Sequence, residues 1–256
     1  MQAVGIALRG ALGILTGLAL CPVVFLWSLI KGARAVHGDG VVYRAELRAA
    51  PDDAAATGAA AAVGARLHGP AIARLSGAFH REGSPEHDVL GLALRLQRDA
   101  SDELTVGDQD LLLGTFESFR TAGRDQAATD ETDYLASANL YHSVSPWRVD
   151  GLGVVKLRAR PRPGDATPDP ARGASRAERL AADVADGRAV LRLEVDGDGS
   201  AALADLHLVA PLASDGRALR ISLGRSGRGI RAVGYRNGIR RVVYPVSQLA
   251  RRLRGR

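Results

Sequence analysis

The sequence predicts an α+β protein in which an antiparallel β-sheet closes as a barrel, with flanking helices and an apolar helix ahead of it. Two observations support the barrel: apolar and polar residues alternate in several short segments, and fewer segments have helical spacing. A third observation is an uncharged apolar run near the N-terminus. The length of 256 residues suits one large domain or two small ones. Hydrophobic residues at 46% and charged residues at 24% exclude a wholly disordered chain.

The apolar run covers residues 11–30 and contains no charged side chain. Twenty helical residues rise about 30 Å, which matches the hydrocarbon core of a bilayer. We therefore expect residues 1–33 to form a single membrane anchor, kinked at Pro22. Two alternatives stay open: a cleaved signal peptide, for which Ala33-Arg34-Ala35 offers a weak site, and an apolar helix packed on a folded domain.

Positive charges follow this run more often than they precede it, with Lys31, Arg34 and Arg44 on one side and Arg9 on the other. The asymmetry predicts a membrane-associated protein whose body, residues 34–256, lies on the cytoplasmic side.

The elements of the body follow from periodicity. Alternation of period two predicts strands, and their residues are 41–47, 90–96, 155–159, 191–195 and 219–223. Helices are predicted over 54–67, from the capping box of Ser175 and Glu178 to Gly187, and over 239–253. Four prolines in residues 160–173 predict an exposed loop.

Composition excludes several classes of function. The single cysteine, Cys21, excludes a disulfide framework and a cysteine-rich metal site. The formal charge of +6 permits an anionic partner, but aromatic residues make up only 4% of the chain. The arginines of the C-terminal tail (Arg251, Arg252, Arg254 and Arg256) lack interleaved aromatic residues, so we expect no nucleic-acid partner and a solvated or lipid-facing tail. His80, Glu86, His87 and Asp88 lack the spacing of metal ligands and indicate a solvated loop.

Six segments, taken in order, resemble haem catalases. They are R-A-V-H-G-D-G-V-V-Y at 34–43, A-R-L-S at 73–76, D-V-L-G-L-A-L-R-L at 88–96, D-L-L-L-G at 110–114, V-V-K-L-R-A-R-P at 154–161 and R-R-V-V-Y-P at 240–245. The resemblance covers about residues 34–254. It implies a barrel of the catalase type that binds haem b.

On the proximal side, the resemblance implies that Tyr244 ligates the haem iron. A tyrosine binds ferric haem as phenolate, so its pKa must fall below the usual value near 10. Arg240 lies four residues earlier, on the same helical face, where a fixed cation favours the phenolate. The alternative is a basic amphipathic helix with an incidental tyrosine.

On the distal side, the resemblance implies that His37 takes a proton from peroxide and returns it to the departing oxygen. Ser76 would hydrogen-bond the imidazole, and Arg34 and Arg74 would meet the haem propionates. The alternatives are an exposed turn residue for His37 and a solvated strand charge for Arg74.

The chain also departs from the family. Catalases place an asparagine near the position of Thr115, whose hydroxyl can donate one hydrogen bond. The chain is also far shorter than a typical catalase and is similar to the minimal catalase-related peroxidases. We therefore expect a peroxidase that acts on hydrogen peroxide or on organic and lipid hydroperoxides, as a monomer or an oligomer. The alternative is a membrane-associated binding or scaffold domain whose catalase-like site is not catalytic.

Overall fold

The computed structural model describes residues 2–31, 37, 40–50, 58–80, 87–100, 108–118, 120–162, 172–197, 201–212 and 219–254. The strands in this part of the chain are β1 (Val41–Arg48), β2 (Gly69–Gly77), β3 (Leu90–Leu96), β4 (Gln109–Gly114), β5 (Tyr141–His142), β6 (Trp147–Val149), β7 (Gly153–Pro161), β8 (Val190–Asp196), β9 (Ala202–Pro211) and β10 (Ile230–Ala232). The helices are α1 (Gln2–Lys31), α2 (Ala59–Leu67), α3 (Ala122–Ala128), α4 (Arg176–Ala185) and α5 (Tyr235–Leu253).

The sheet closes into an antiparallel barrel, as the sequence predicts. The strands follow the order β7-β5-β4-β3-β2-β1-β9-β8, and β8 pairs back onto β7. Strands β6 and β10 extend the sheet beyond β7. Closure removes the free sheet edges that would otherwise be open to pairing with another chain.

Strand β3 is buried on both faces, although the sequence indicated a simple alternating strand. Leu90, Leu92, Leu94 and Leu96 point into the barrel core. Ala93 faces the other way and packs in a second apolar cluster with Val42, Ile72, Leu219 and Ile221. The wall of the barrel near β3 is therefore covered from outside by other parts of the chain.

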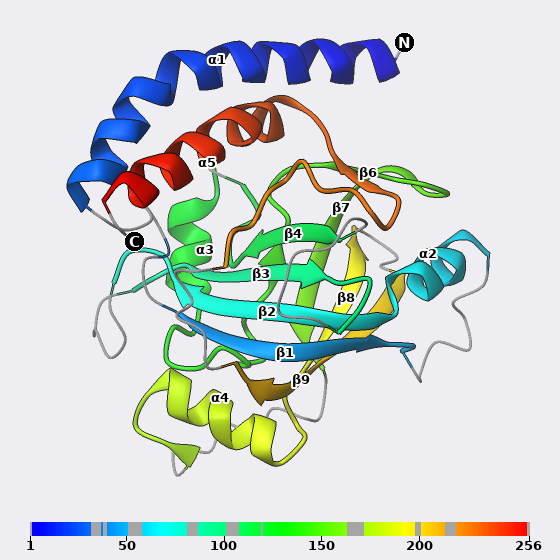
Figure 1. Ribbon diagram of the computed structural model, residues 1–256. Helices are drawn as coiled ribbons and strands as arrows, with labels where there is room; N and C mark the ends of the chain where they lie inside the picture. Colours follow the sequence, from blue (N-terminus) through cyan, green and yellow to red (C-terminus); the bar gives the residue numbers. More distant parts are fainter. Residues whose placement is uncertain are drawn as a thin grey trace.

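Helices α1 and α5 lie side by side on one side of the barrel, and α4 lies at the opposite side of the molecule (Figure 1). Helix α1 bends as it runs over α5 and contains Pro22, which removes one backbone hydrogen bond. By length and composition alone, α1 could cross a membrane.

Most of the predicted elements are confirmed, with three corrections. The exposed loop predicted over 160–173 begins later, because β7 extends to the buried Pro161, and residues 163–171 lie outside the described residues. Helix α4 begins at its Ser175–Glu178 capping box, and Gly187 beyond its end has a φ of 70°. Helix α5 begins one turn earlier than expected, at Tyr235. The strand expected at 219–223 is wrong: this segment is irregular, because its apolar side chains fill the second cluster while its backbone bonds to side chains rather than to a strand.

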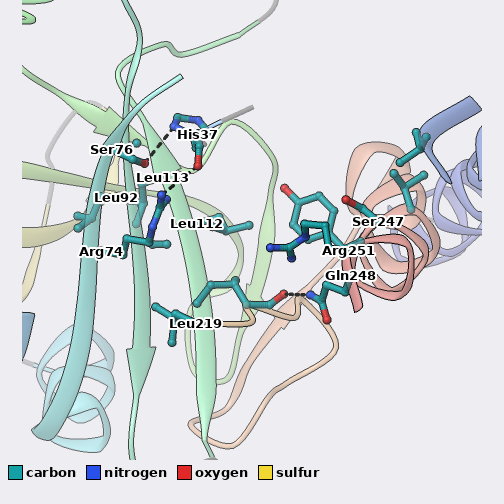
Figure 2. Close-up of a pocket in the computed structure, with 16 residues that line it drawn as sticks. His37, Arg74, Ser76, Leu92, Leu112, Leu113, Leu219, Ser247, Gln248 and Arg251 are labelled. Carbon is teal, nitrogen blue, oxygen red and sulfur yellow. Dashed lines mark hydrogen bonds between the residues drawn. The ribbon is translucent and has the colours of Figure 1, made fainter. Parts of the chain in front are cut away.

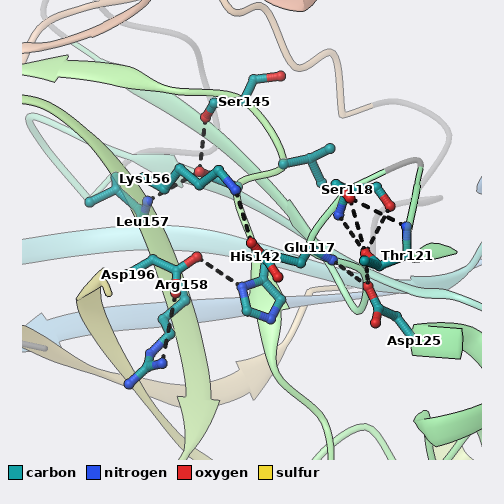
Figure 3. A network of polar contacts seen from close by, with 12 residues as sticks. Glu117, Ser118, Thr121, Asp125, His142, Ser145, Lys156, Leu157, Arg158 and Asp196 are labelled. Atoms are coloured by element: carbon teal, nitrogen blue, oxygen red, sulfur yellow. Dashed lines mark hydrogen bonds and ion pairs between the residues drawn. The ribbon is translucent and has the colours of Figure 1, made fainter. Parts of the chain in front are cut away.

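A polar network joins β5, β7 and β8 on the barrel surface (Figure 3). His142 Nδ1 lies 2.9 Å from Asp196 Oδ2, and Arg158 Nη1 lies 3.7 Å from the other carboxylate oxygen. Nearby, Lys156 Nζ lies 3.2 Å from Glu117 Oε1. The hydrogen bond from His142 is the main cause that lowers the pKa of Asp196.

We expect Asp196→Asn to destabilise the protein by about 1.5–3 kcal/mol at neutral pH, the contribution of a hydrogen bond to a charged group. Because the folded state depresses the pKa of Asp196, this contribution is present above the unfolded pKa and disappears as pH falls through the folded one. Thermal unfolding of the parent protein and of Asp196→Asn, measured between pH 7 and acid pH, should show that their difference in stability becomes smaller below about pH 4. A gap that stays constant would contradict the prediction.

Candidate functional site

A cavity of about 270 Å³ lies between strands β2–β4 and helix α5. Its walls are mainly apolar, and its polar side chains come from both sides (Figure 2). His37, Arg74 and Ser76 lie on the barrel side, whereas Ser247, Gln248 and Arg251 lie on α5. Four of the residues predicted for the site therefore line one cavity: His37, Arg74, Ser76 and Tyr244.

His37 is half-buried and held at three atoms, so it is not an exposed turn residue. Its backbone N–H donates to Ala78 O at 2.9 Å, and its carbonyl accepts from Arg74 Nη2 at 2.9 Å. Its Nδ1 lies 3.1 Å from Ser76 Oγ, the contact that the resemblance implies. The φ of His37 is 60°, an uncommon conformation for a non-glycine residue. Positive φ at a residue held this firmly is typical of functional sites.

Gly91 gives the imidazole its space. A Cβ at this position would lie 2.5 Å from His37 Cε1 and 2.7 Å from Nδ1. The ring therefore packs directly on the backbone of β3, and an alanine here would displace it.

The turn after β2 is fixed by Asp88, which is fully buried. Its carboxylate accepts from the backbone N–H groups of Ala78, Phe79 and His80 at 2.9–3.1 Å. Because Ala78 O accepts from His37, Asp88 supports the histidine indirectly. The Asp88 carboxylate thus binds backbone N–H groups rather than a metal. His87 is exposed and lies beside Glu131. Within the described residues no group of histidine, cysteine or acidic side chains could hold a metal ion, and Glu86 lies outside them.

Arg74 is 2% exposed, so it is not a solvated strand charge. Its guanidinium lines the cavity and anchors the His37 carbonyl. Arg34, its expected companion, lies outside the described residues.

The opposite wall is formed by one face of α5. Val243, Tyr244, Ser247, Gln248 and Arg251 line the cavity at the one-turn spacing of a helix. Gln248 Nε2 donates to Ile221 O at 3.0 Å and fixes α5 to the irregular segment 219–223 (Figure 2).

Arg251 was expected in a solvated tail, and this expectation is wrong. Its side chain is buried and lines the cavity. Burial lowers the pKa of Arg251, and the nearby charge of Arg220 lowers it further. A desolvated cation at a cavity is a binding group for an anion. Its position two turns after Tyr244, on the same helical face, was the signal in the sequence that could have identified it.

Arg240 lies one turn before Tyr244 on α5 and does not line the cavity. Its Nη1 atom is buried and has no hydrogen-bond partner among the described residues. Buried guanidinium nitrogens usually have an acceptor, and the described residues supply none for this atom.

Asp110 fixes the part of the cavity wall that carries Leu219 and Ile221. It is fully buried, and Arg95 Nε donates to it at 3.0 Å from the opposite position on β3. Ser222 N and Arg225 Nη1 also donate to its carboxylate, at 2.7 and 2.5 Å. Arg95 in turn donates to the carbonyl of Arg220. Asp110 is therefore one of the groups that bind the segment before α5 to the barrel, together with Gln109, which donates to the carbonyl of Arg225.

Thr115 does not line the cavity. Its hydroxyl accepts from Leu90 N at 2.9 Å and lies 3.0 Å from Thr129 Oγ1. These bonds join the ends of β3 and β4. The structure does not bring Thr115 together with His37 and Ser76.

No family model and no curated protein sequence matches the chain. Among solved structures, the chain is similar to a fungal catalase, with a TM-score of 0.53 and 12% sequence identity. The similarity covers 86% of this chain and 59% of the catalase chain. At this identity the likeness concerns the fold. The protein thus has a catalase-type fold, an antiparallel barrel with flanking helices, and spans about 59% of the length of that catalase.

Proposed function

We propose that the cavity binds haem b, with Tyr244 as the proximal ligand and His37 on the distal side, and that the protein reduces hydroperoxides. The observation that carries the proposal is the placement of His37 and Tyr244, from the two ends of the chain, on opposite walls of one apolar cavity. An imidazole and a phenol facing a common apolar space are the donors that a tyrosine-ligated haem requires.

The residues present fit this cofactor in three further respects. Leu92, Leu112 and Ile221 provide an apolar lining for a macrocycle. Arg74 and Arg251 are buried cations at the cavity, suited to propionate carboxylates. Arg240 carries a positive charge one turn before Tyr244 on α5, and a nearby cation would favour a phenolate ligand.

When bound, ferric haem would supply the two electrons that reduce a hydroperoxide to an alcohol and water, and an external electron donor would return these electrons to the haem. The chain's own residues handle the proton. Ser76 Oγ at Nδ1 and Gly91 beneath the ring fix the imidazole, so Nε2 is the atom that takes a proton from the hydroperoxide and returns it to the departing oxygen. Arg74 holds the His37 backbone, which keeps this atom in place.

Organic hydroperoxides are the proposed substrates, ahead of the disproportionation of hydrogen peroxide. The described residues that line the His37 side of the cavity include no side-chain amide to orient a second small peroxide, and Thr115 does not replace one. The same observation favours a second candidate, a non-catalytic protein that binds an apolar anion.

The absorption spectrum of the full chain, expressed with a haem precursor, tests the proposal. We expect a Soret band with high-spin ferric features in the parent protein and its loss or shift in Tyr244→Phe, because phenylalanine removes the ligand oxygen. Tyr235→Phe is the matched control on the same helix, since the Tyr235 hydroxyl donates to Thr16 on α1 rather than facing the cavity. A folded, colourless parent protein would overturn the proposal, and equal spectra in all three proteins would reject Tyr244 as the ligand.

A further inference from the structure

The outer face of α1 is apolar and exposed along the whole helix. The large apolar side chains more than half exposed on it are Val4, Leu8, Leu12, Leu15, Leu18, Val23, Leu26, Trp27 and Ile30. Soluble monomers rarely expose a continuous apolar surface of this extent. The composition of this face is therefore typical of a surface that is buried against another apolar surface or in a membrane.

The inner face of α1 is already used by α5, which runs parallel to it. A Cβ at Gly13 or Gly238 would clash with the facing backbone, and one at Gly17 would lie 3.0 Å from Ile239 O. Farther along, Ser28 Oγ and Ser247 Oγ are 2.8 Å apart, and Arg254 donates to carbonyls at the end of α1. The two helices are therefore packed together from Gly10 of α1 to the C-terminal end of α1.

This packing conflicts with an α1 that spans a bilayer. Helix α5 carries Arg236, Arg240, Arg241, Arg251 and Arg252 within nineteen residues. A spanning α1 that kept its contacts would carry these guanidinium groups into hydrocarbon, where each is costly. An α1 that stays on α5 must instead lie in the plane of the interface, with its outer face in the acyl chains.

The charges on α1 and α5 indicate which kind of surface would contact the outer face of α1. Neither helix contains an aspartate or a glutamate, whereas Arg9, Arg252 and Arg254 are exposed on them. A groove beside the first half of α1 is lined by Ile6 and Ile14 together with Arg148 and Arg241. A second copy of the chain would place like charges against one another, but anionic headgroups complement them.

We propose that the α1–α5 face, meaning the outer side of α1 with the exposed arginines of α1 and α5, lies flat on a bilayer containing anionic lipids while α1 stays packed on α5. Val24 of α1 lines the cavity, so the cavity would lie directly behind the lipid-bound helix. This inference does not depend on haem.

A disulfide between α1 and α5 tests whether the two helices stay together. The full chain would carry Cys21→Ser, Ser28→Cys and Ser247→Cys, since the two serine hydroxyls already touch. Flotation would use vesicles of phosphatidylcholine, with and without phosphatidylserine. We expect the oxidised and reduced proteins to bind anionic vesicles equally, at least about tenfold more tightly than neutral ones, and to be released by alkaline carbonate. Reduced protein that binds and resists carbonate, with no binding of the oxidised form, would show a spanning helix and overturn the proposal.

Single substitutions give a second test that needs no disulfide. Leu15→Glu places a charge in the centre of the outer face and is expected to abolish flotation. Val209→Glu is the matched control, because Val209 is similarly exposed but lies on β9 in the barrel. Equal flotation of the two variants would overturn the proposal. So would a parent protein that floats with neither vesicle and elutes as a dimer.

Discussion

Replacing His37 by alanine is expected to slow hydroperoxide reduction by the haem-loaded protein by about 10²- to 10⁴-fold. The variant loses the imidazole that transfers the proton, but it keeps the α5 wall of the cavity with Tyr244 and Arg251. The Soret band should therefore remain while turnover of an organic hydroperoxide falls. His87→Ala is the control, since His87 lies on the surface beside Glu131. Unchanged turnover in His37→Ala would remove His37 from the mechanism.

Gly91→Ala provides an independent check of the same step through the position of the ring. The added Cβ would lie 2.5 Å from His37 Cε1, so the imidazole must move. We expect kcat to fall with little change in haem uptake, and we expect Gly91→Ala to cause no further loss in a protein that already carries His37→Ala. Gly123→Ala is the matched control, because a Cβ there meets nothing within 4 Å. Additive losses in the double variant would show that Gly91 acts on something other than His37.

Asp110→Ala is expected to lower the free energy of unfolding by about 3–5 kcal/mol, the usual cost of leaving a buried ion-pair partner uncompensated. Arg95 is 5% exposed and would keep its charge inside the structure without Asp110. Ser222 and Arg225 would lose the same acceptor, so the segment before α5 would be bound less firmly to the barrel. Urea denaturation measures the loss.

The control for this prediction is Asp186→Ala, which removes an exposed ion pair with Arg188. Surface pairs contribute little, so its effect should stay below about 1 kcal/mol. Should Asp110→Ala fail to fold, Asp110→Asn retains the shape of the side chain and should still be less stable than the parent. Equal stability of the Asp110 and Asp186 variants would show that the network around Asp110 contributes no more than a surface contact.

The sequence predicted the barrel because its strands carry a local signal. Leucines alternate through β3 and β8, and the period fixes both the strand and its inner face. The capping box of α4 also depends only on residues that are close in the sequence, so it could be predicted. The segment 219–223 has the same alternation, but among the described residues it pairs with no strand. Its side chains are buried against Val42 and Ile72, which are distant in the sequence.

The site residues could be predicted from the sequence only because the segments that contain them follow the same order as the similar segments of catalases. One cavity is lined by His37, Arg74, Ser76 and Tyr244. They meet there because the barrel closes and α5 packs on it, and the periodicity of the sequence predicts neither of these contacts. Arg251 was missed because a C-terminal arginine-rich stretch resembles a solvated tail, and only its helical register relative to Tyr244 separates it from Arg252 and Arg254. Thr115 was placed near the peroxide by analogy, whereas its hydroxyl is taken up between β3 and β4.

The pairing of α1 with α5 also constrains how the chain can be made. Helix α1 is translated first, and the helix that covers its inner face follows about two hundred residues later. Throughout that interval the inner face of α1 is exposed as well as its outer face, and one wall of the cavity does not exist. A nascent chain would therefore present a long apolar helix to chaperones or to a bilayer before the barrel is complete. Ribosome-stalled chains that end before Tyr235 should accordingly associate with vesicles more strongly than the finished protein.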